Sequence, residues 1–485
     1  MSGATALAGD EATRPARQAA AGSGGSGLAL ALRQALPGVV LLVLVLQTTL
    51  PVQDPDTFWH LAAGDRLRET WTFSGPDPWS TMSSRPWSLH EWLPELLMSG
   101  VQQLAGLPGV AWLLPLGAAA IGLTLWLVTR RRAPLLVATP VLVAAVIALS
   151  LSLSLRPHLV SFALAAVTTD AWLRTRDDGR ARWWLVPLTW LWACSHGMWF
   201  VGVVIGGVTL VGLFLDRAAR GRAWWRLALV PAASLAAATL TPVGPQLLLT
   251  PLSVREYAAF VTEWRSPALT DIAFVAFLVL TAATVLVWAR QRRATTWTEI
   301  LLVGLAIGFA LLYVRTIAVA AAIIAPLAAM TLARVVPLER EPIRRREVAL
   351  TAGLTAIGLL VAGLILPARA AAPSGVPDDL SAQLRALPTG TVLCNDYSSG
   401  GWLIWAHPNV RPAIDGRTEV YAVSHVESYL RFQDARPGWQ SYLRETGCRW
   451  ALVRSGSAVA EALVAQTRWT VTARGATHLL LRAPG

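Results

Sequence analysis

The sequence contains no lysine, and only 14% of its 485 residues are charged, compared with about 25% in ordinary soluble domains. It has no Walker-type phosphate loop and no seven-residue repeat, so nothing in it indicates a P-loop nucleotide site or a coiled coil. Its apolar runs do not alternate with polar residues, as half-buried strands do. The low content of charged residues argues against an ordinary soluble protein. The lack of alternation in the apolar runs favours helices over strands.

The sequence is rich in long apolar runs instead. Hydrophobic residues make up 54% of the chain, and the mean hydropathy is +0.49. Because a membrane-spanning helix needs about 20 mostly apolar residues, we predict an α-helical polytopic membrane protein. Eleven candidate spans lie near 37–52, 109–128, 134–151, 159–173, 183–195, 199–215, 227–245, 272–289, 299–313, 317–333 and 348–367.

Arginine clusters between these runs predict the orientation of the chain. Arginines that lie in short loops between apolar runs are typical of membrane topology, and they explain the formal charge of +12 without nucleic-acid binding. We therefore expect no nucleic-acid partner. Loops rich in arginine face the cytoplasm. The predicted cytoplasmic parts are a disordered N-terminus at 1–34 and the loops "RRR" (130–132), "RTRDDGRAR" (174–182), "DRAARGRAWWR" (216–226), "RQRR" (290–293) and "REPIRRR" (340–346). The membrane domain then covers 35–367, and its first loop, 53–108, is extracytoplasmic.

Ionisable residues gather at the predicted extracytoplasmic ends of several helices. Such groups are costly at membrane depth and usually face a cavity or a partner. For any single residue, snorkelling at a helix end is an equal alternative, but convergence from several helices favours a shared site. The residues are His60, His90, His158, His196, Arg156, Arg255, Glu256, Glu263, Arg265, Asp271 and Arg315.

The first extracytoplasmic loop reads as two helices lying on the membrane. Asp54 before Pro55 is typical of a helix cap followed by the first helical residue, so we expect a helix over 55–69. Asp56 and His60 are four residues apart and share one face of it. Phe58 and Leu61 are expected to face the lipid. "RPWSLHEWLPELL" (85–97) begins the second interfacial helix.

The sequence pattern from 368 to 485 predicts a small extracytoplasmic α/β domain. "GTVLCND" (390–396), "VRPAIDGR" (410–417) and "CRWALVR" (448–454) read as strands, and a hairpin is expected around Gly475. Cys394 and Cys448 share this compartment and could pair, although sequence spacing does not establish the geometry. The domain could recognise an acceptor or simply dock on the membrane part.

Several stretches resemble the C-type superfamily of membrane glycosyltransferases, which use polyprenyl-phosphate sugars and carry acidic residues in a first loop of two interfacial helices. The similarity covers about 50–455 and is stronger to a bacterial group than to the protein O-mannosyltransferases and lipid A aminoarabinose transferases. The stretches include "DPDTFWHLAAGDRLRETWTFSGPDPWS", "RPWSLHEWL", "LSLRPHLVSFAL", "WLWACSHGMWFVG", "TEWRSPALTD", "YVRTIAVAAAIIAP" and "NDYSSGGWLIWAHPNVRPAIDGRTEVY".

The resemblance implies an inverting sugar transfer at the outer face of a bacterial cytoplasmic membrane. The donor would be a polyprenyl-phosphate sugar, and the acceptor an envelope glycan, lipid or protein. Asp56 is the candidate base, and His60, His90 and Glu91 join it in the catalytic set. The candidate phosphate ligands are Arg156, Arg265, Arg315 and Arg255. Asp54, His158, His196 and Glu263 are expected to line the substrate cavity.

Two points of this interpretation stay open. The loop has Asp56-Thr57 where the better-known pattern has two adjacent acids, so a divalent metal on Asp56, His60, His90 and Glu91 is a possibility rather than an expectation. The reaction class also has rivals. A glycan ligase or polymerase using lipid-diphosphate donors fits the same outer site. A transporter is disfavoured because no internal repeat in two halves is visible, and an envelope assembly protein would not need this convergence of polar residues.

Overall fold

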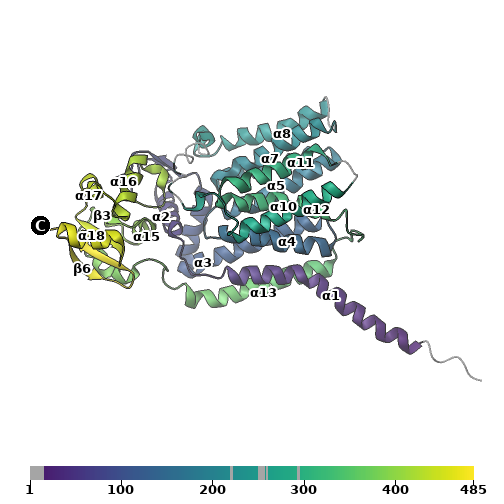
Figure 1. The fold of residues 1–485 in the computed structure, drawn as a ribbon, viewed down its shortest axis with the longest axis horizontal. Coiled ribbons are helices and arrows are strands. Elements are labelled where there is room, and N and C mark those ends of the chain that lie inside the picture. Colours follow the sequence, from purple (N-terminus) through teal and green to yellow (C-terminus); the bar gives the residue numbers. More distant parts are fainter. Residues whose placement is uncertain are drawn as a thin grey trace, which may run out of the picture.

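The computed structural model describes residues 16–218, 222–249, 257, 260, 262–291 and 295–484. It has a helical bundle at one end and a small α/β domain at the other, with the short helix α2 (Pro55–Thr70) between them (Figure 1). The bundle consists of α1 (Ala16–Gln47), α3 (Trp92–Arg130), α4 (Leu135–Leu149), α5 (Leu159–Asp178), α6 (Leu185–Ala193), α7 (Phe200–Leu215), α8 (Arg222–Ala238), α10 (Ile272–Arg290), α11 (Trp297–Leu312), α12 (Ile317–Leu332) and α13 (Arg345–Arg369).

Each of the eleven predicted spans overlaps one of these helices. In the described part of the chain, seven helices are long and apolar enough to cross a membrane, so the full count of eleven spans stays a prediction. The central helix is α12, because 83% of its apolar window is buried inside the protein, compared with 22% for the peripheral α13. The alanines of "AVAAAIIAPLAA" let neighbouring helices approach α12 closely.

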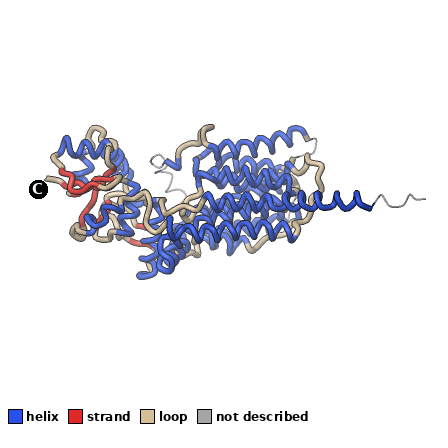
Figure 2. The backbone as a smooth tube through the Cα atoms, turned by 90° about the horizontal axis from the view of Figure 1, so that it is seen from below, coloured by secondary structure: helices blue, strands red, loops and turns tan. Residues whose placement is uncertain are grey.

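The N-terminal segment differs from its prediction. We expected disorder over 1–34, but the chain is helical from Ala16 onward, and residues 1–15 lie outside the described part. Alanine is the strongest helix former, and "ARQAAA" begins α1. The first half of α1 extends beyond the bundle as a single helix (Figures 1 and 2).

The first helix of the 53–108 loop forms as predicted, and Asp54 caps it by accepting a hydrogen bond from the backbone N–H of Asp56. The second helix begins later than expected, at Trp92 rather than 85. The preceding residues form a short antiparallel ladder between β1 (Ser74–Gly75) and β2 (Trp87–Ser88). Gly106, with φ +62, then separates the first part of α3 from its long bundle segment.

The lipid-facing assignment of α2 is wrong. Phe58 and Leu61 are both completely buried in protein, and the Phe58 ring lies 5.6 Å from that of Trp405 in the C-terminal domain. Gly401 packs so closely on α2 that an added Cβ would lie 2.4 Å from the carbonyl oxygen of Pro55. The helix is therefore held between the bundle and the C-terminal domain.

The C-terminal domain contains one five-stranded sheet, in the order β4-β3-β5-β7-β6 (Figure 2, red). β3 pairs in parallel with β4 and β5, whereas β7 is antiparallel to β5 and β6. The strands are β3 (Thr391–Asn395), β4 (Val410–Pro412), β5 (Trp450–Arg454), β6 (Thr470–Arg474) and β7 (His478–Arg482). The helices are α14 (Ser381–Arg385), α15 (Gly400–Ala406), α16 (Val423–Gln433), α17 (Gln440–Thr446) and α18 (Ala458–Thr467).

This domain agrees with the sequence-based expectation in its main features. The three predicted strands and the C-terminal hairpin are present. Cys394 and Cys448 form a disulfide, with their Cα atoms 5.7 Å apart. The bridge ties β3 to the loop that leads into β5, two strands that are also hydrogen-bonded to each other.

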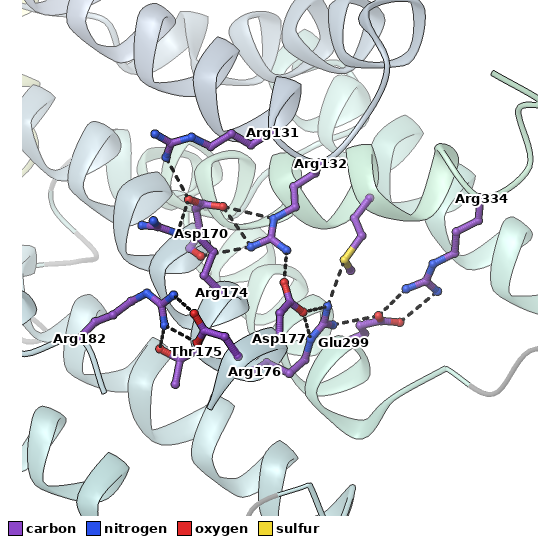
Figure 3. Close-up of polar contacts among 12 residues, drawn as sticks. Arg131, Arg132, Asp170, Arg174, Thr175, Arg176, Asp177, Arg182, Glu299 and Arg334 are labelled. Carbon is purple, nitrogen blue, oxygen red and sulfur yellow. Dashed lines mark hydrogen bonds and ion pairs between the residues drawn. The ribbon is translucent and has the colours of Figure 1, made fainter. Parts of the chain in front are cut away.

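At the bundle end away from this domain, arginines from two predicted cytoplasmic loops and from the end of α12 surround the carboxylates of Asp170 and Glu299 (Figure 3). Asp170, 1% exposed, forms ion pairs with Arg131, Arg132 and Arg174. Glu299 pairs in the same way with arginines of α5 and the α12 end. Arginines of two predicted cytoplasmic loops, 130–132 and 174–182, thus lie at one end of the bundle and join helix ends to one another; the orientation of the chain in the membrane stays a prediction.

We expect Asp170→Asn to destabilise the bundle by up to about 3 kcal/mol, because it leaves three arginines around a buried site without their carboxylate. Thermal unfolding in detergent measures the effect. Asp178→Asn is the matched control, since Asp178 pairs with Arg182 but its side chain is 41% exposed, and exposed pairs contribute about 0–1 kcal/mol. Equal losses in both variants would contradict a structural role of the buried network.

Candidate functional site

A cleft of about 720 Å³ opens between the bundle end and the C-terminal domain. Asp56 from the start of α2, Arg156 from the turn before α5 and Glu263 line one side. Asp396 and Tyr397, which follow β3, line the other. The cleft therefore joins three of the predicted site residues to the domain whose role the sequence left open.

Arg156 holds three carboxylates together on the bundle side of this cleft. Its Nε lies 2.7 Å from Asp54 Oδ2, its Nη1 lies 3.0 Å from Asp56 Oδ2, and its Nη2 lies 3.1 Å from Glu263 Oε1. The capping position of Asp54 and the first turn of α2 place the two aspartates side by side, so one planar guanidinium can reach both. Arg156 thus orients Asp56 toward the cleft.

Burial raises the pKa of Asp56, and the nearby Asp54 carboxylate adds to the effect, whereas the Arg156 guanidinium lowers it. The net direction is upward. A carboxylate with a raised pKa is a stronger base when ionised, which suits the acceptance of a proton from a hydroxyl group.

Arg315 is the second predicted phosphate ligand that reaches the site. Its Nη1 lies 3.7 Å from Glu263 Oε2, and its guanidinium lies 6.0 Å from the centre of the Trp264 ring. Glu263 is 41% exposed in its side chain, so this ion pair is long and partly open to solvent. Arg315 is therefore less firmly held than Arg156.

A second cluster lies deeper, one turn along α2 from Asp56. His60 Nδ1 is 2.9 Å from Glu95 Oε1, and His60 Nε2 is 3.8 Å from Glu91 Oε2. His90 and His196 approach Glu91 from other directions, with Nε2 atoms 3.6 and 3.5 Å from Glu91 Oε1. Among the described residues, His60, Glu91 and Glu95 form a group whose ligand atoms lie within 4.8 Å of one another.

The remaining predicted residues lie apart from the cleft lining or outside the described part. His158 is buried, its Nε2 is 2.7 Å from the carbonyl oxygen of Ser152, and its ring lies 6.1 Å from that of His196. Arg265 pairs with Asp271, with Nη1 2.8 Å from Oδ2, and its side chain is 45% exposed. The Arg265 backbone carbonyl accepts a hydrogen bond from the N–H of Val314, next to Arg315, but the Arg265 guanidinium is paired with Asp271. Arg255 lies outside the described residues.

The sequence left open whether the C-terminal domain recognises an acceptor or docks on the membrane part, and the structure places its Asp396 and Tyr397 in the cleft lining. Gly416 of the "IDGR" motif lies against Asp56, where an added Cβ would meet Asp56 Oδ1 at 1.9 Å. The Tyr397 hydroxyl is hydrogen-bonded to Gly416 and Thr418. Burial first, and the Asp56 carboxylate second, raise the pKa of Tyr397. The glycine in "IDGR" indicated a close approach of the backbone to another group. The sequence did not indicate that this group is Asp56.

Glu95 was also missed, because one carboxylate in an apolar helix start reads as a solvated residue. Its position four residues after Glu91, the residue that precedes α3, was the available signal, since that spacing places the two side chains on one side of the helix start. For a metal, the predicted set of Asp56, His60, His90 and Glu91 does not gather: Asp56 is engaged by Arg156, and Glu95 joins His60 and Glu91 instead.

No protein-family model matches the chain, and a comparison with curated proteins finds no match. Solved structures share its fold. The oligosaccharyltransferase of Archaeoglobus fulgidus, in complex with Zn and sulfate, is 13% identical, with a TM-score of 0.57 over 87% of this chain and 67% of that one. ArnT from Cupriavidus metallidurans in the apo state is 13% identical, with a TM-score of 0.51 over 95% and 98%.

ArnT bound to undecaprenyl phosphate is 15% identical, with a TM-score of 0.50 over 94% of this chain and 98% of that one. These structural neighbours are C-type glycosyltransferases, and they are polytopic membrane proteins. The likeness shows a shared fold, and the described helices and five-stranded C-terminal sheet agree with the predicted fold class in its main features.

Proposed function

We propose that this protein is an inverting membrane glycosyltransferase that moves a sugar from a polyprenyl-phosphate donor to an acceptor in the cell envelope. The observation that carries the proposal is the pairing of Asp56 and Arg156 in the lining of the cleft, in a fold shared with solved glycosyltransferases. A base of raised pKa beside cations is the chemistry that such a transfer requires.

In the proposed reaction, an acceptor hydroxyl oxygen attacks the anomeric carbon while the bond from that carbon to the phosphate oxygen breaks. Asp56 takes the hydroxyl proton, and the electron pair of the broken bond leaves with the polyprenyl phosphate. Arg315 binds this phosphate, because its existing ion pair to Glu263 is long and a phosphate offers closer oxygens. Arg156 positions Asp56 and keeps it ionised.

The disulfide and the arginine distribution support an extracytoplasmic position of the cleft. Disulfides persist in oxidising compartments, and Cys394–Cys448 belongs to the domain that forms one wall of the cleft. Arginines of the loops 130–132 and 174–182 form ion pairs with carboxylates of neighbouring helices at the other bundle end. The site then faces outward from a bacterial cytoplasmic membrane, with the N-terminus in the cytoplasm.

The test is transfer from a panel of labelled donors by the purified protein in detergent or nanodiscs. Polyprenyl-phosphate monosaccharides form one arm, and lipid-diphosphate oligosaccharides form the other. Turnover in the first arm supports the proposal. Turnover in the second arm alone would replace it with a glycan ligase or polymerase. Failure of every donor to react or bind, with envelope extracts supplied as acceptors, would favour a transporter or assembly role.

We expect Arg315→Gln to raise the KM for the donor by about 10–100-fold, because hydrogen bonds to charged groups contribute about 1.5–3 kcal/mol. Steady-state kinetics with varied donor measure the effect. Arg265→Gln is the matched control: it comes from the same predicted phosphate set, yet its guanidinium pairs with Asp271. A larger increase in KM for Arg265→Gln than for Arg315→Gln would overturn this assignment.

A further inference from the structure

We propose that Arg131 and Arg174, here called the arginine pair, bind the phosphate of an anionic phospholipid at the bundle end away from the C-terminal domain. The site is separate from the cleft and from every residue proposed to act in sugar transfer. Lipid binding there is measured without turnover, so its test does not depend on the proposed reaction.

The ion-pair network at this bundle end contains more arginines than carboxylates (Figure 3). Its linked members are Arg131, Arg132, Arg174, Arg176 and Arg334 on the cationic side, and Asp170, Asp177 and Glu299 on the anionic side. Five guanidiniums against three carboxylates leave two positive charges without a counter-ion within this network of described residues.

The excess charge lies on the most exposed members of the network. The side chains of Arg131 and Arg174 are 41% and 39% exposed, whereas that of Arg132 is 9% exposed. The arginine pair shares a single atom, Asp170 Oδ2, at distances of 3.4 and 3.1 Å, while Arg132 approaches Oδ1.

This sharing leaves hydrogen-bonding capacity on the arginine pair. Among the described residues, Asp170 is the only side chain with which either member pairs. Each guanidinium carries five N–H donors, so one carboxylate oxygen satisfies only a small part of them. Both members therefore have donors available for a second anion.

A phosphate group fits this requirement better than a single carboxylate. Two like charges that share one partner repel each other, and a second anion would relieve that repulsion. A phosphate presents several oxygens to the planar fork of a guanidinium, which binds such groups bidentately. Asp170, 1% exposed, would stay in place and position both guanidiniums.

Exposed tryptophans near the network indicate the level of the lipid headgroups. Trp183 and Trp184 directly follow the loop 174–182, and Trp297 begins α11, the helix that carries Glu299. All three tryptophan side chains are exposed. Tryptophan is enriched where a protein crosses the interface between membrane and water, so a phosphate on the arginine pair is expected at headgroup depth.

α4 offers an apolar surface for the acyl chains. It begins four residues after Arg131, and its Leu136, Val143 and Ile147 are exposed. Their spacing of seven and then four residues places them on one face of the helix. Cationic sites between membrane helices bind anionic lipid headgroups, and the apolar face favours a phospholipid over a soluble phosphate compound.

The experiment measures lipid binding by the intact, detergent-purified protein. Phosphatidylglycerol and phosphatidylcholine with identical acyl chains are titrated, and bound lipid is counted by native mass spectrometry. Glycerol phosphate, which has no acyl chains, forms a third arm. The variant combines Arg131→Gln with Arg174→Gln. The matched control combines Arg340→Gln with Arg344→Gln, which removes the same charge from the exposed loop between α12 and α13.

We expect the wild type and the control to bind phosphatidylglycerol at least about 10-fold more tightly than phosphatidylcholine, and the double variant to lose this preference. Phosphatidylglycerol should also raise the unfolding temperature of the wild type more than that of the double variant. Arg131→Gln alone keeps the arginine of α5 and should lose part of the preference, so the test holds even if the double variant does not fold.

Three results would overturn the proposal. An equal loss of preference in the control would show general attraction of anionic lipid to a basic surface. Equal affinity of the folded wild type for the two lipids would show apolar adsorption without a phosphate site. Binding of glycerol phosphate as tightly as phosphatidylglycerol would assign the arginine pair to a soluble phosphate compound instead of a lipid.

Discussion

Replacing Asp56 by asparagine should lower the rate of sugar transfer by about 10²–10⁴-fold, the usual contribution of a positioned general base. Asparagine has nearly the same shape, and its carbonyl oxygen can still accept a hydrogen bond from Arg156, now 3.0 Å from Asp56 Oδ2. It cannot take the acceptor proton. The loss should therefore appear in kcat with the preferred donor, while donor binding changes little.

Two controls make this result specific to the base. Asp65→Asn removes a carboxylate from the same helix, at a position bonded to Ser99 rather than to the cleft, and should keep near wild-type activity. Unfolding temperature and donor binding of Asp56→Asn show that the site is intact. Transfer that survives within a few-fold in a folded Asp56→Asn would move the base elsewhere, with His60 and Glu91 the next candidates.

The pH dependence of transfer follows from the same carboxylate. The base acts when it is ionised, so kcat/KM should fall as the pH decreases through the pKa of Asp56. Because burial raises that pKa, the acidic limb should lie above the value of about 3.9 found for an ordinary aspartate. Arg156→Gln removes the cation that lowers the pKa and should shift the limb to higher pH. An unchanged limb in Arg156→Gln would show that another group titrates.

Sequence reasoning succeeded where the structure depends on local patterns. Long apolar runs predicted the bundle helices, because each run must bury its own backbone polar groups as a helix. Asp54 and Pro55 predicted the start of α2, because the cap and the first helical residue are set by neighbouring atoms. The gathering of Asp54, Asp56, Arg156 and Glu263 was anticipated only in outline, from topology.

The errors came from contacts between distant parts of the chain. Phe58 and Leu61 look lipid-facing in isolation, yet residues more than 340 positions later cover Phe58. The helix expected from 85 begins at Trp92, because Trp87 and Ser88 pair with β1 and the backbone of Arg85 donates to the Val420 carbonyl. No local periodicity encodes such pairings, so the contact of Gly416 with Asp56 could not be predicted, although acceptor binding by the C-terminal domain was one of the two alternatives left open.

Arg417→Met should release the C-terminal domain from the first loop at a cost of about 3–5 kcal/mol, the penalty of leaving buried charges without their partner. Arg417 is completely buried, and its guanidinium pairs with Asp77 of the first loop and Asp415 of its own domain, each at 2.7 Å. It also lies over the Trp79 ring, 4.6 Å from the centre. Both carboxylates would lose their counter-ion at once.

Hydrogen exchange can separate loss of docking from loss of folding in this variant. If Arg417 joins the two parts, exchange should increase together in residues 77–89 and 412–421, and transfer should fall because Gly416 no longer lies against Asp56. Arg436→Ala is the control, since the Arg436 side chain is 65% exposed and such pairs contribute about 0–1 kcal/mol. Increased exchange throughout the C-terminal sheet, with unchanged exchange in 77–89, would instead show that Arg417 stabilises its own domain. Other contacts would then hold the C-terminal domain against the cleft.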